Sequence, residues 1–365
     1  MRKSFWTAVL LIGLAGICST AQAAPPPGPR LAFVRLFEHR AEAVDDSLDL
    51  LTTDPGGGAA QLLTGTSRPG GVPPVEGFAW SPDGQTLAIG AVRGQQFFQS
   101  LLFNDELDLF LAAADGSGLR QLTNFPDNEG EVSDDAVSPV FSADSRTVFF
   151  ARVSQDLHSS IWAIGVDGSG LRQLTPDAGG TSIDVPASAS PSGDQLAFTR
   201  VRCVRGFRGC RSNAVAISLT TGAERLIAKR AMEPAYSPDG TRIAFTGYGR
   251  RKPNIENELL PSTDLYVLDA VGGRNRRLTR TKGLTEGHPS WDPSGQRIAF
   301  SRGSSTGLLG QNPGASPRIL EINADGSCET LLFRKAVKDH SFFGKDFAFP
   351  TWQPGPGREA GRIAC

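Results

Sequence analysis

Hydrophobic and polar positions repeat along this chain as pairs of short apolar segments, each pair joined by a tight turn. Residues 78–89 read FAWSPDGQTLAI, with the turn at Ser-Pro-Asp-Gly between two apolar stretches. Proline fixes φ at the second turn position, aspartate accepts local backbone hydrogen bonds, and glycine takes a positive φ. The pattern therefore predicts a β-hairpin. Related hairpins are expected at 139–150, 187–198, 234–245 and 289–300.

A second hairpin pattern follows each copy of the first. It runs from Asp108 through Asp115-Gly116-Ser117-Gly118 to Thr123, and it recurs over 161–175, 215–227, 265–279 and 319–332. Its anchor leucines follow one another at intervals of 52 residues: Leu122, Leu174, Leu226 and Leu278. Two hairpins supply four strands, and a four-stranded unit repeating at this interval is typical of a β-propeller blade.

The two ends of the chain complete the count of blades. Five whole units run from about residue 74 to 333, and residues 347–355 match only the first strand of another. The rest of that unit matches residues 30–34 and 48–64. We therefore expect an all-β, six-bladed propeller of four-stranded blades, the last blade having one C-terminal and three N-terminal strands. Such closure leaves no open sheet edge around the ring.

The hairpins followed by Ala-Asp-Gly-Ser-Gly and Arg-Gln-Leu-Thr resemble the TolB-type propeller repeat. The resemblance covers nearly the whole of residues 30–365, which implies a single propeller domain like those of exported proteins. TolB carries an α/β domain before its propeller, whereas here the propeller strands are expected to begin at Leu31, so that domain is expected to be absent. A propeller fold hosts many functions, so the resemblance implies the fold more specifically than the activity.

The first 23 residues have the features of a secretory signal peptide. Arg2 and Lys3 precede an apolar run over 5–17, and the segment ends Ala21-Gln22-Ala23. This charged, apolar and small-x-small order predicts cleavage after Ala23. A proline-rich leader over 24–29 would follow. We expect a periplasmic or extracellular protein with no membrane span after cleavage.

Composition and charge narrow the classes of partner. The 42 glycines and 25 prolines fit a turn-rich β fold, and the formal net charge of −1 argues against a strongly cationic nucleic-acid binder. We expect a monomer that binds no nucleic acid.

Export changes the interpretation of the cysteines. Without Cys18, four remain, and in an oxidising compartment they indicate two disulfides. Cys203 and Cys210 bracket a short glycine-containing loop that could close on itself. Cys328 lies in a turn on the face where the tail after Trp352 leaves, so Cys365 is expected to reach it. Zinc binding is the alternative, disfavoured because the spacings lack paired short knuckles.

In a propeller the first strand of each blade is the inner strand, which lines the central channel. Each inner strand is expected to carry one carboxylate near the mouth of this channel, with one histidine at the same level. These residues are Glu76, Asp135, Asp184, Glu233, Glu286 and Asp346, with His288. A ring of acids could hold a cation, a basic peptide or a ligand with amino groups. The competing interpretation is a solvated rim that caps turns, and a hydrogen-bonded histidine without a catalytic role.

Neighbouring long loops carry a second group of candidates, all cationic. They are Arg202, Arg205, Arg208, Arg211, Arg250, Arg251 and Lys252. Guanidinium groups suit an acidic partner or the carboxylates of a glycan, whereas the plainer interpretation is solubility.

Catalytic motifs are weak in this sequence. Residues 303–307 fit G-x-S-x-G in letters, but they follow a predicted propeller strand and lack the strand–turn–helix setting of a nucleophile elbow. We expect a non-catalytic scaffold that binds an envelope or secreted protein, or a small ligand, through its loop-rich face and channel mouth. No cofactor or protein-bound metal is assigned, although a cation in the channel is possible. The alternative is a carbohydrate-active or other enzyme, or a ligand-binding propeller, that uses the channel-mouth carboxylates with a bound cation.

Overall fold

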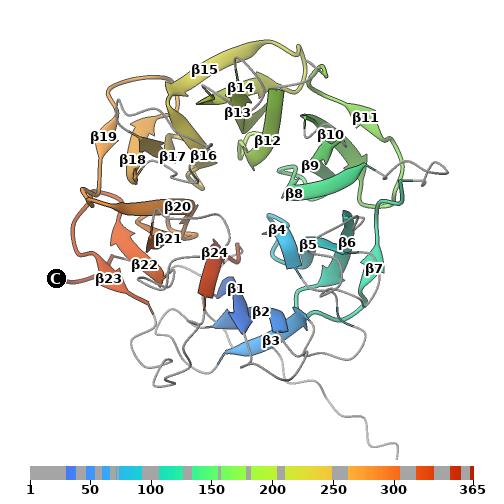
Figure 1. Ribbon diagram of the computed structural model, residues 1–365, viewed down its shortest axis with the longest axis horizontal. Helices are drawn as coiled ribbons and strands as arrows, with labels where there is room; N and C mark the ends of the chain where they lie inside the picture. The colour runs from blue at the N-terminus through green and yellow to red at the C-terminus, as the bar shows by residue number, and fades with distance from the viewer. Residues whose placement is uncertain are drawn as a thin grey trace, which may run out of the picture.

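The predicted hairpins are arranged radially around a common axis in the computed structural model (Figure 1). The structure describes residues 30–37, 47–53, 60–65, 71, 74–92, 107–125, 134–154, 158–177, 182–203, 210–248, 262–304, 318–332, 346–354 and 362–365. All regular structure in these residues is β-strand. The same residues contain no helix with the length and apolar character that a membrane crossing requires.

Four of the sheets in the described residues have four strands each. One has the order β24 (Asp346–Trp352), β1 (Leu31–Phe37), β2 (Ser47–Thr53), β3 (Gln61–Gly65). The next has β4 (Pro74–Trp80), β5 (Thr86–Val92), β6 (Leu107–Ala113), β7 (Arg120–Gln121). The other two are β16 (Ala231–Tyr236), β17 (Arg242–Tyr248), β18 (Thr263–Asp269), β19 (Arg276–Arg277), and β20 (Leu284–Trp291), β21 (Arg297–Ser304), β22 (Arg318–Asn323), β23 (Thr330–Leu331).

The remaining strands form one larger sheet of eight. Its first antiparallel group is β8 (Asp135–Phe141), β9 (Thr147–Val153), β10 (Ser159–Gly165), β11 (Arg172–Gln173). Its second is β12 (Ser182–Ala189), β13 (Gln195–Arg202), β14 (Arg211–Ser218), β15 (Glu224–Lys229). A single parallel pair, Ser159 with Ile183, joins the two groups. The described chain is therefore an all-β propeller.

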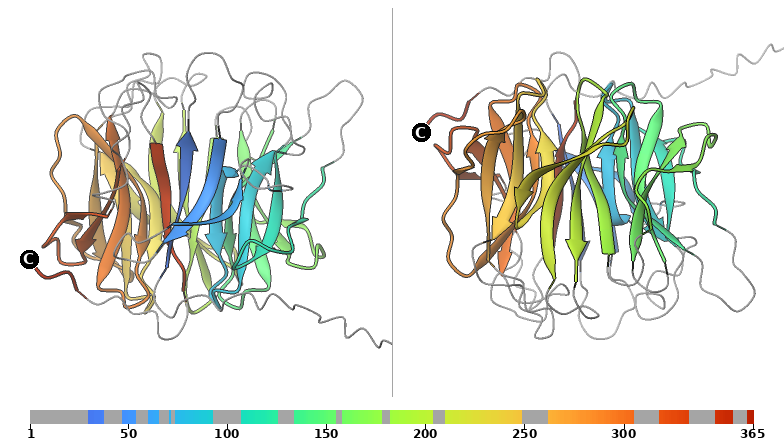
Figure 2. Two further views of the ribbon diagram at one scale, coloured as in Figure 1. Left: turned by 90° about the horizontal axis from the view of Figure 1, so that it is seen from below. Right: turned by 90° about the horizontal axis from the view of Figure 1, so that it is seen from above.

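The strands run along the axis of the ring, between two faces (Figure 2). We call the face with the tight hairpin turns, such as residues 81–85 and 324–329, the turn face. The opposite end, where β13 stops and β14 begins, is the loop face. The first strand of each hairpin pair surrounds the axis: β4, β8, β12, β16, β20 and β24.

The predicted turn chemistry is confirmed at Ser-Pro-Asp-Gly. The Ser81 hydroxyl donates to Oδ1 of Asp83 (2.5 Å) and accepts from the backbone N–H of Thr86 (2.9 Å). Gly84 has a φ of 70°, a conformation that costs glycine little. Ser237, Asp239 and Gly240 repeat the arrangement. The turn is therefore closed by side-chain bonds among its own residues.

Aromatic side chains at the ends of inner strands pack against the preceding sheet. Trp80 contacts residues of β1–β3, and Trp291 contacts residues of β17 and β18. The predicted anchor Leu226 differs, because its side chain is 48% exposed. A register shift between β14 and β15 at Ala214 and Val215 places Ala228 in the core instead.

Strands from the two ends of the chain close the ring. β24 pairs antiparallel with β1, and Leu31 lies opposite Trp352. Beyond β24, the Gln353 N–H donates to the Arg30 carbonyl (2.8 Å), and its side-chain amide donates to the Gly84 carbonyl (2.7 Å) of the next sheet. The predicted closing sheet of one C-terminal and three N-terminal strands is present.

A buried ion pair stands at the seam beside this closing sheet. Arg297 donates to Glu321 (3.0 Å), and its guanidinium lies over the Trp352 ring (5.3 Å to the centroid). Only 2% of Glu321 is exposed, and its Oε1 has no partner in the described residues. Burial raises the pKa of Glu321 to about 7, and the nearby Asp292 adds to the rise while Arg297 opposes it.

Replacing Glu321 by glutamine should flatten the pH dependence of stability. Between the ordinary value of 4.5 and about 7, the folded protein binds a proton at Glu321 that the unfolded chain has lost. Stability therefore falls as pH rises through this window. Raising the pH from about 5 to about 8 should lower the melting temperature of the wild type by a few degrees more than that of Glu321→Gln. Thermal unfolding of both proteins across this pH range measures the difference.

The exposed Asp269→Asn variant is the matched control and should follow the wild-type curve. Parallel curves for wild type and Glu321→Gln would contradict the assignment.

Candidate functional site

The six predicted carboxylates all lie on inner strands, but they do not form one set. Asp184 and Glu286 are buried, whereas the side chains of Glu233 and His288 are about one-third exposed. Glu76 and Asp346 lie on β4 and β24, and their side chains are outside the described part of the structure.

Asp184 is bound by an arginine of the neighbouring strand. Arg200 donates from Nε (2.9 Å) and Nη2 (2.7 Å) to its two oxygens, and also bonds Glu224. Hydrogen bonds from Arg200 to Asp184, and then to Glu224, raise the pKa of Arg200 above its usual value despite burial. The guanidinium also lies over the Phe198 ring at 4.9 Å. Asp184 is therefore fully engaged within its own sheet.

Glu286 repeats this network in another sheet. Arg302 donates to its Oε1 from Nε (2.9 Å) and Nη2 (2.6 Å), and reaches Glu329 with Nη1 (2.5 Å). Burial disfavours the charged form of Arg302, but Glu329 and Glu286 outweigh it and raise its pKa. Glu286 Oε2 also accepts the Leu265 N–H (2.9 Å) of the preceding sheet. Asp135 accepts the Leu107 N–H (2.9 Å) in the same way.

These contacts correct the expectation that Asp184 and Glu286 face a ligand at the channel mouth. In the strand register Asp184 lies opposite Arg200, and Glu286 lies opposite Arg302. The carboxylates are thus drawn into the sheets and neutralised there. The signal that the sequence offers is an arginine 16 residues after each acid.

Glu233 and His288 form a different arrangement, on adjacent inner strands at the axis. Glu233 Oε2 accepts the His288 N–H (2.8 Å), and Oε1 lies 3.2 Å from its Nε2. His288 Nδ1 lies 3.1 Å from the Ser301 hydroxyl, and Glu233 Oε2 accepts from Thr246 (3.1 Å). The expected hydrogen-bonded histidine is thus confirmed, and it has a carboxylate partner.

The backbone at this level is a repeated bulge. Glu233, His288 and Ser138 all have φ of 54°, and Gly77 has 92°, each inside a register shift of its inner strand. Side chains other than glycine rarely adopt this conformation, which costs about 1 kcal/mol or more. The bulge therefore sets the orientation of Glu233 and His288 at the axis.

Among the described side chains, no three His, Cys, Asp or Glu residues lie close enough together to hold a metal ion.

Of the predicted basic residues, two lie in the described part of the structure, and both are at the loop-face end of the β13–β14 hairpin. Arg202 and Arg211 lie opposite each other at the loop-face ends of β13 and β14. Arg202 Nη1 lies 3.3 Å from Asp184, and burial lowers its pKa, whereas Arg211 is exposed. The other predicted cations are outside the described residues: Arg205, Arg208, Arg250, Arg251 and Lys252.

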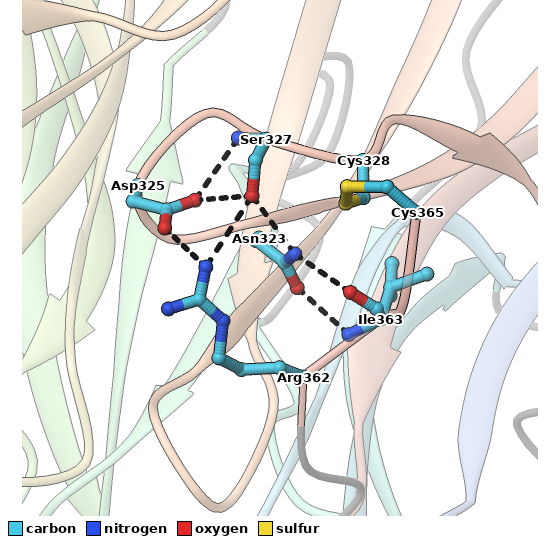
Figure 3. The surroundings of a disulfide bond; sticks show 7 residues. All are labelled: Asn323, Asp325, Ser327, Cys328, Arg362, Ile363 and Cys365. Atoms are coloured by element: carbon cyan, nitrogen blue, oxygen red, sulfur yellow. Dashed lines mark hydrogen bonds and ion pairs between the residues drawn. A yellow bond between two sulfur atoms is a disulfide. The ribbon is translucent and has the colours of Figure 1, made fainter.

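Both expected disulfides are present. Cys203 is bonded to Cys210 at the end of the β13–β14 hairpin, and Cys328 is bonded to Cys365 on the turn face (Figure 3).

Replacing Arg200 by methionine should destabilise the fold strongly. The change removes the two-bond partner of the buried Asp184 carboxylate and leaves only Arg202, 3.3 Å away, beside it. Breaking a buried ion pair typically costs about 3 kcal/mol or more. Denaturant unfolding of the purified variant measures it.

Adding Asp184→Asn to Arg200→Met should recover part of that loss, because the buried charge is then removed. The exposed Arg172→Met control should change stability by less than about 0.5 kcal/mol. An Arg200→Met variant as stable as this control would show that the network carries no weight.

Comparisons with known proteins address the fold. No family model matches this sequence. An uncharacterized protein of Agrobacterium fabrum is 28% identical over 186 residues, covering 51% of this chain and 52% of that protein. A protein TolB homolog of Chlorobium chlorochromatii is 28% identical over 161 residues, covering 43% of this chain and 31% of the homolog. The matches thus span about half and about a third of these relatives.

A solved structure of a TolB protein has a similar fold. TolB from Acinetobacter baumannii superimposes with a TM-score of 0.59 at 17% identity, over 89% of this chain and 67% of that one. Together with the closing sheet and the repeated hairpins, this similarity defines the fold. The chain is a TolB-like β-propeller.

Proposed function

We propose that this chain is an exported, non-catalytic binding scaffold that engages an acidic envelope or secreted partner through its loop face. In this proposal the eight-stranded sheet counts as two blades joined only at Ser159 and Ile183, which makes a six-bladed ring. The TolB likeness and the signal-like N-terminus support an envelope location.

The observation that carries the proposal is the disulfide-closed hairpin. Cys203 and Cys210 close residues 204–209 into a short loop at the end of two long strands. A loop closed in this way has less conformational entropy to lose on binding. Arg202 and Arg211 flank the disulfide, and Arg205 and Arg208 lie within the loop sequence. Two arginines beside the disulfide and two more within the closed segment favour a partner with carboxylates.

The fate of the inner-strand acids supports a binding role over catalysis. Arginine partners neutralise Asp184 and Glu286, and Asp135 accepts a backbone N–H of the preceding sheet. A general acid or base must reach the reacting atoms of a substrate. These three carboxylates instead hold strands and sheets together.

A second candidate function rests on Glu233 and His288. Their side chains are 33% and 36% exposed at the axis, on the bulges that give both residues a positive φ. A small ligand with hydrogen-bond donors, with or without a cation, fits this pair. This candidate keeps open the alternative of a ligand-binding or carbohydrate-active propeller.

Replacing two arginines of the hairpin by serine should abolish capture of the acidic partner by the scaffold. The purified protein serves as bait for an envelope extract, beside a variant with Arg205→Ser and Arg208→Ser. Loss of two guanidinium contacts should deplete a specific acidic protein about tenfold or more.

The control carries Arg172→Ser and Arg274→Ser, an equal charge change at exposed positions away from the hairpin. It should retain the partner. Identical captured proteins for all three baits would refute binding through this hairpin.

The axis candidate is tested by thermal shift with calcium, manganese and uronic acids. A ligand-induced rise in melting temperature should disappear in Glu233→Gln and in His288→Asn, and persist in the Arg205→Ser, Arg208→Ser variant. No shift in the wild type with any of these probes would eliminate this second function.

A further inference from the structure

An open surface cavity of about 360 Å³ lies on the turn face, at the seam between the β16–β19 sheet and the β20–β23 sheet. It is formed by the start of β17, the β20–β21 turn, the β22–β23 turn and the C-terminal tail. Its lining residues are Arg242, Gly295, Gln296, Ala324, Asp325 and Arg362. Two arginines therefore face one cavity from different parts of the chain.

Arg242 is held rigidly in the cavity wall. Its guanidinium lies over the Trp291 ring, 4.7 Å from the centroid, and Nη2 donates to the Gly295 carbonyl (2.7 Å). Within the described residues, its Nε and Nη1 make no hydrogen bond. A fixed guanidinium with unused donors can bind an oxyanion at little entropic cost.

Arg362 belongs to the tail, and the tail is attached at three points (Figure 3). The Ile363 N–H donates to Oδ1 of Asn323 (2.8 Å), and the Asn323 amide returns a bond to the Ile363 carbonyl (3.0 Å). Two residues on, Cys365 is bonded covalently to Cys328. Arg362 itself contacts Asp325 and lies 3.4 Å from the Ser327 hydroxyl.

The charges around the cavity favour an anion. Hydrogen bonds from Ser327, reinforced by Arg362, lower the pKa of Asp325 to about 2, so this carboxylate is ionised at neutral pH. It offsets one of the two lining arginines. Arg276 of β19 adds a third guanidinium beside the cavity, because its Nη2 donates to the Ala324 carbonyl (2.6 Å). The balance of these four side chains is positive.

The repeat architecture accounts for only part of this cluster. Arg120 donates to the Val166 carbonyl at another seam, just as Arg276 donates to Ala324, so that contact is a repeated structural bond. The tail arginine and its disulfide have no counterpart at the other seams in the described residues. They are what turns an ordinary seam into a cavity with a second cationic wall.

We propose that this cavity binds the carboxylate or phosphate group of a small ligand, and that the Cys328–Cys365 disulfide holds Arg362 in position for it. The guanidinium groups of Arg242 and Arg362 supply the donors, and Gln296 at the rim offers an amide to the rest of the ligand. The site lies on the face opposite the basic hairpin. Binding at this site can therefore be tested separately from the proposed scaffold function.

Calorimetric titration of the full oxidised protein with inorganic phosphate and with citrate tests the site. Arg362→Ala should weaken binding of the preferred probe about tenfold or more, because a charge-assisted contact to the anion is lost. The Cys328→Ser, Cys365→Ser double variant should weaken it similarly. Arg242→Lys tests the stacked arginine while keeping its charge.

The control is Arg274→Ala, which removes a positive charge from an exposed turn on the same face without lining the cavity. It should bind like the wild type. Tighter binding of phosphate or of citrate decides which anion the site prefers.

Absence of binding by both probes at millimolar concentration would overturn the proposal. Equal weakening in Arg274→Ala and Arg362→Ala would also overturn it, because diffuse surface charge would then explain the effect. Full affinity in the cysteine double variant would refute the role of the disulfide. Melting curves of each variant show that a loss of binding is not a loss of fold.

Discussion

The backbone pairing of β24 with β1 is the constraint on which the ring depends. Each sheet buries its apolar face against the next, so a ring with one unpartnered sheet would expose two seams to water. The closing sheet avoids this by taking strands from both ends of the chain, and Gln353 bonds across to Gly84 of the following sheet. The last strand thereby also meets β4, and every inner strand has a neighbour on both sides.

Polar residues near the axis mainly bond one sheet of the ring to the next. Asp135 and Glu286 each accept a backbone N–H of the preceding sheet, and Arg302 neutralises Glu286 from within its own sheet. A carboxylate in this position joins two sheets and is compensated by charge, which is how a buried acid is tolerated. The exposed side chains that a ligand could reach lie elsewhere. They are at the bulge of Glu233 and His288, on the loop face and at the seams of the turn face.

Local chemistry explains why the hairpins and disulfides were predictable from the sequence. A Ser-Pro-Asp-Gly turn closes through bonds among its own residues, and two cysteines on short segments of one face have few partners within reach. The setting of Asp184 was not predictable, because it depends on the register of β12 against β13, which a bulge between Pro186 and Ser188 shifts. The exposure of Leu226 has the same origin in β14 and β15. The turn-face cavity depends on where the tail docks, which no repeat encodes.

The closing sheet also fixes an order of events during synthesis. Strands β1 to β3 are made first, yet their edge partner β24 follows some three hundred residues later in the chain. Until Asp346–Trp352 have been made, β1 lacks the neighbour that completes its sheet, and the seams on either side stay incomplete. Partly exposed apolar surface and unpaired strand edges favour aggregation. The early strands therefore stay open to wrong partners until β24 is available to pair with β1.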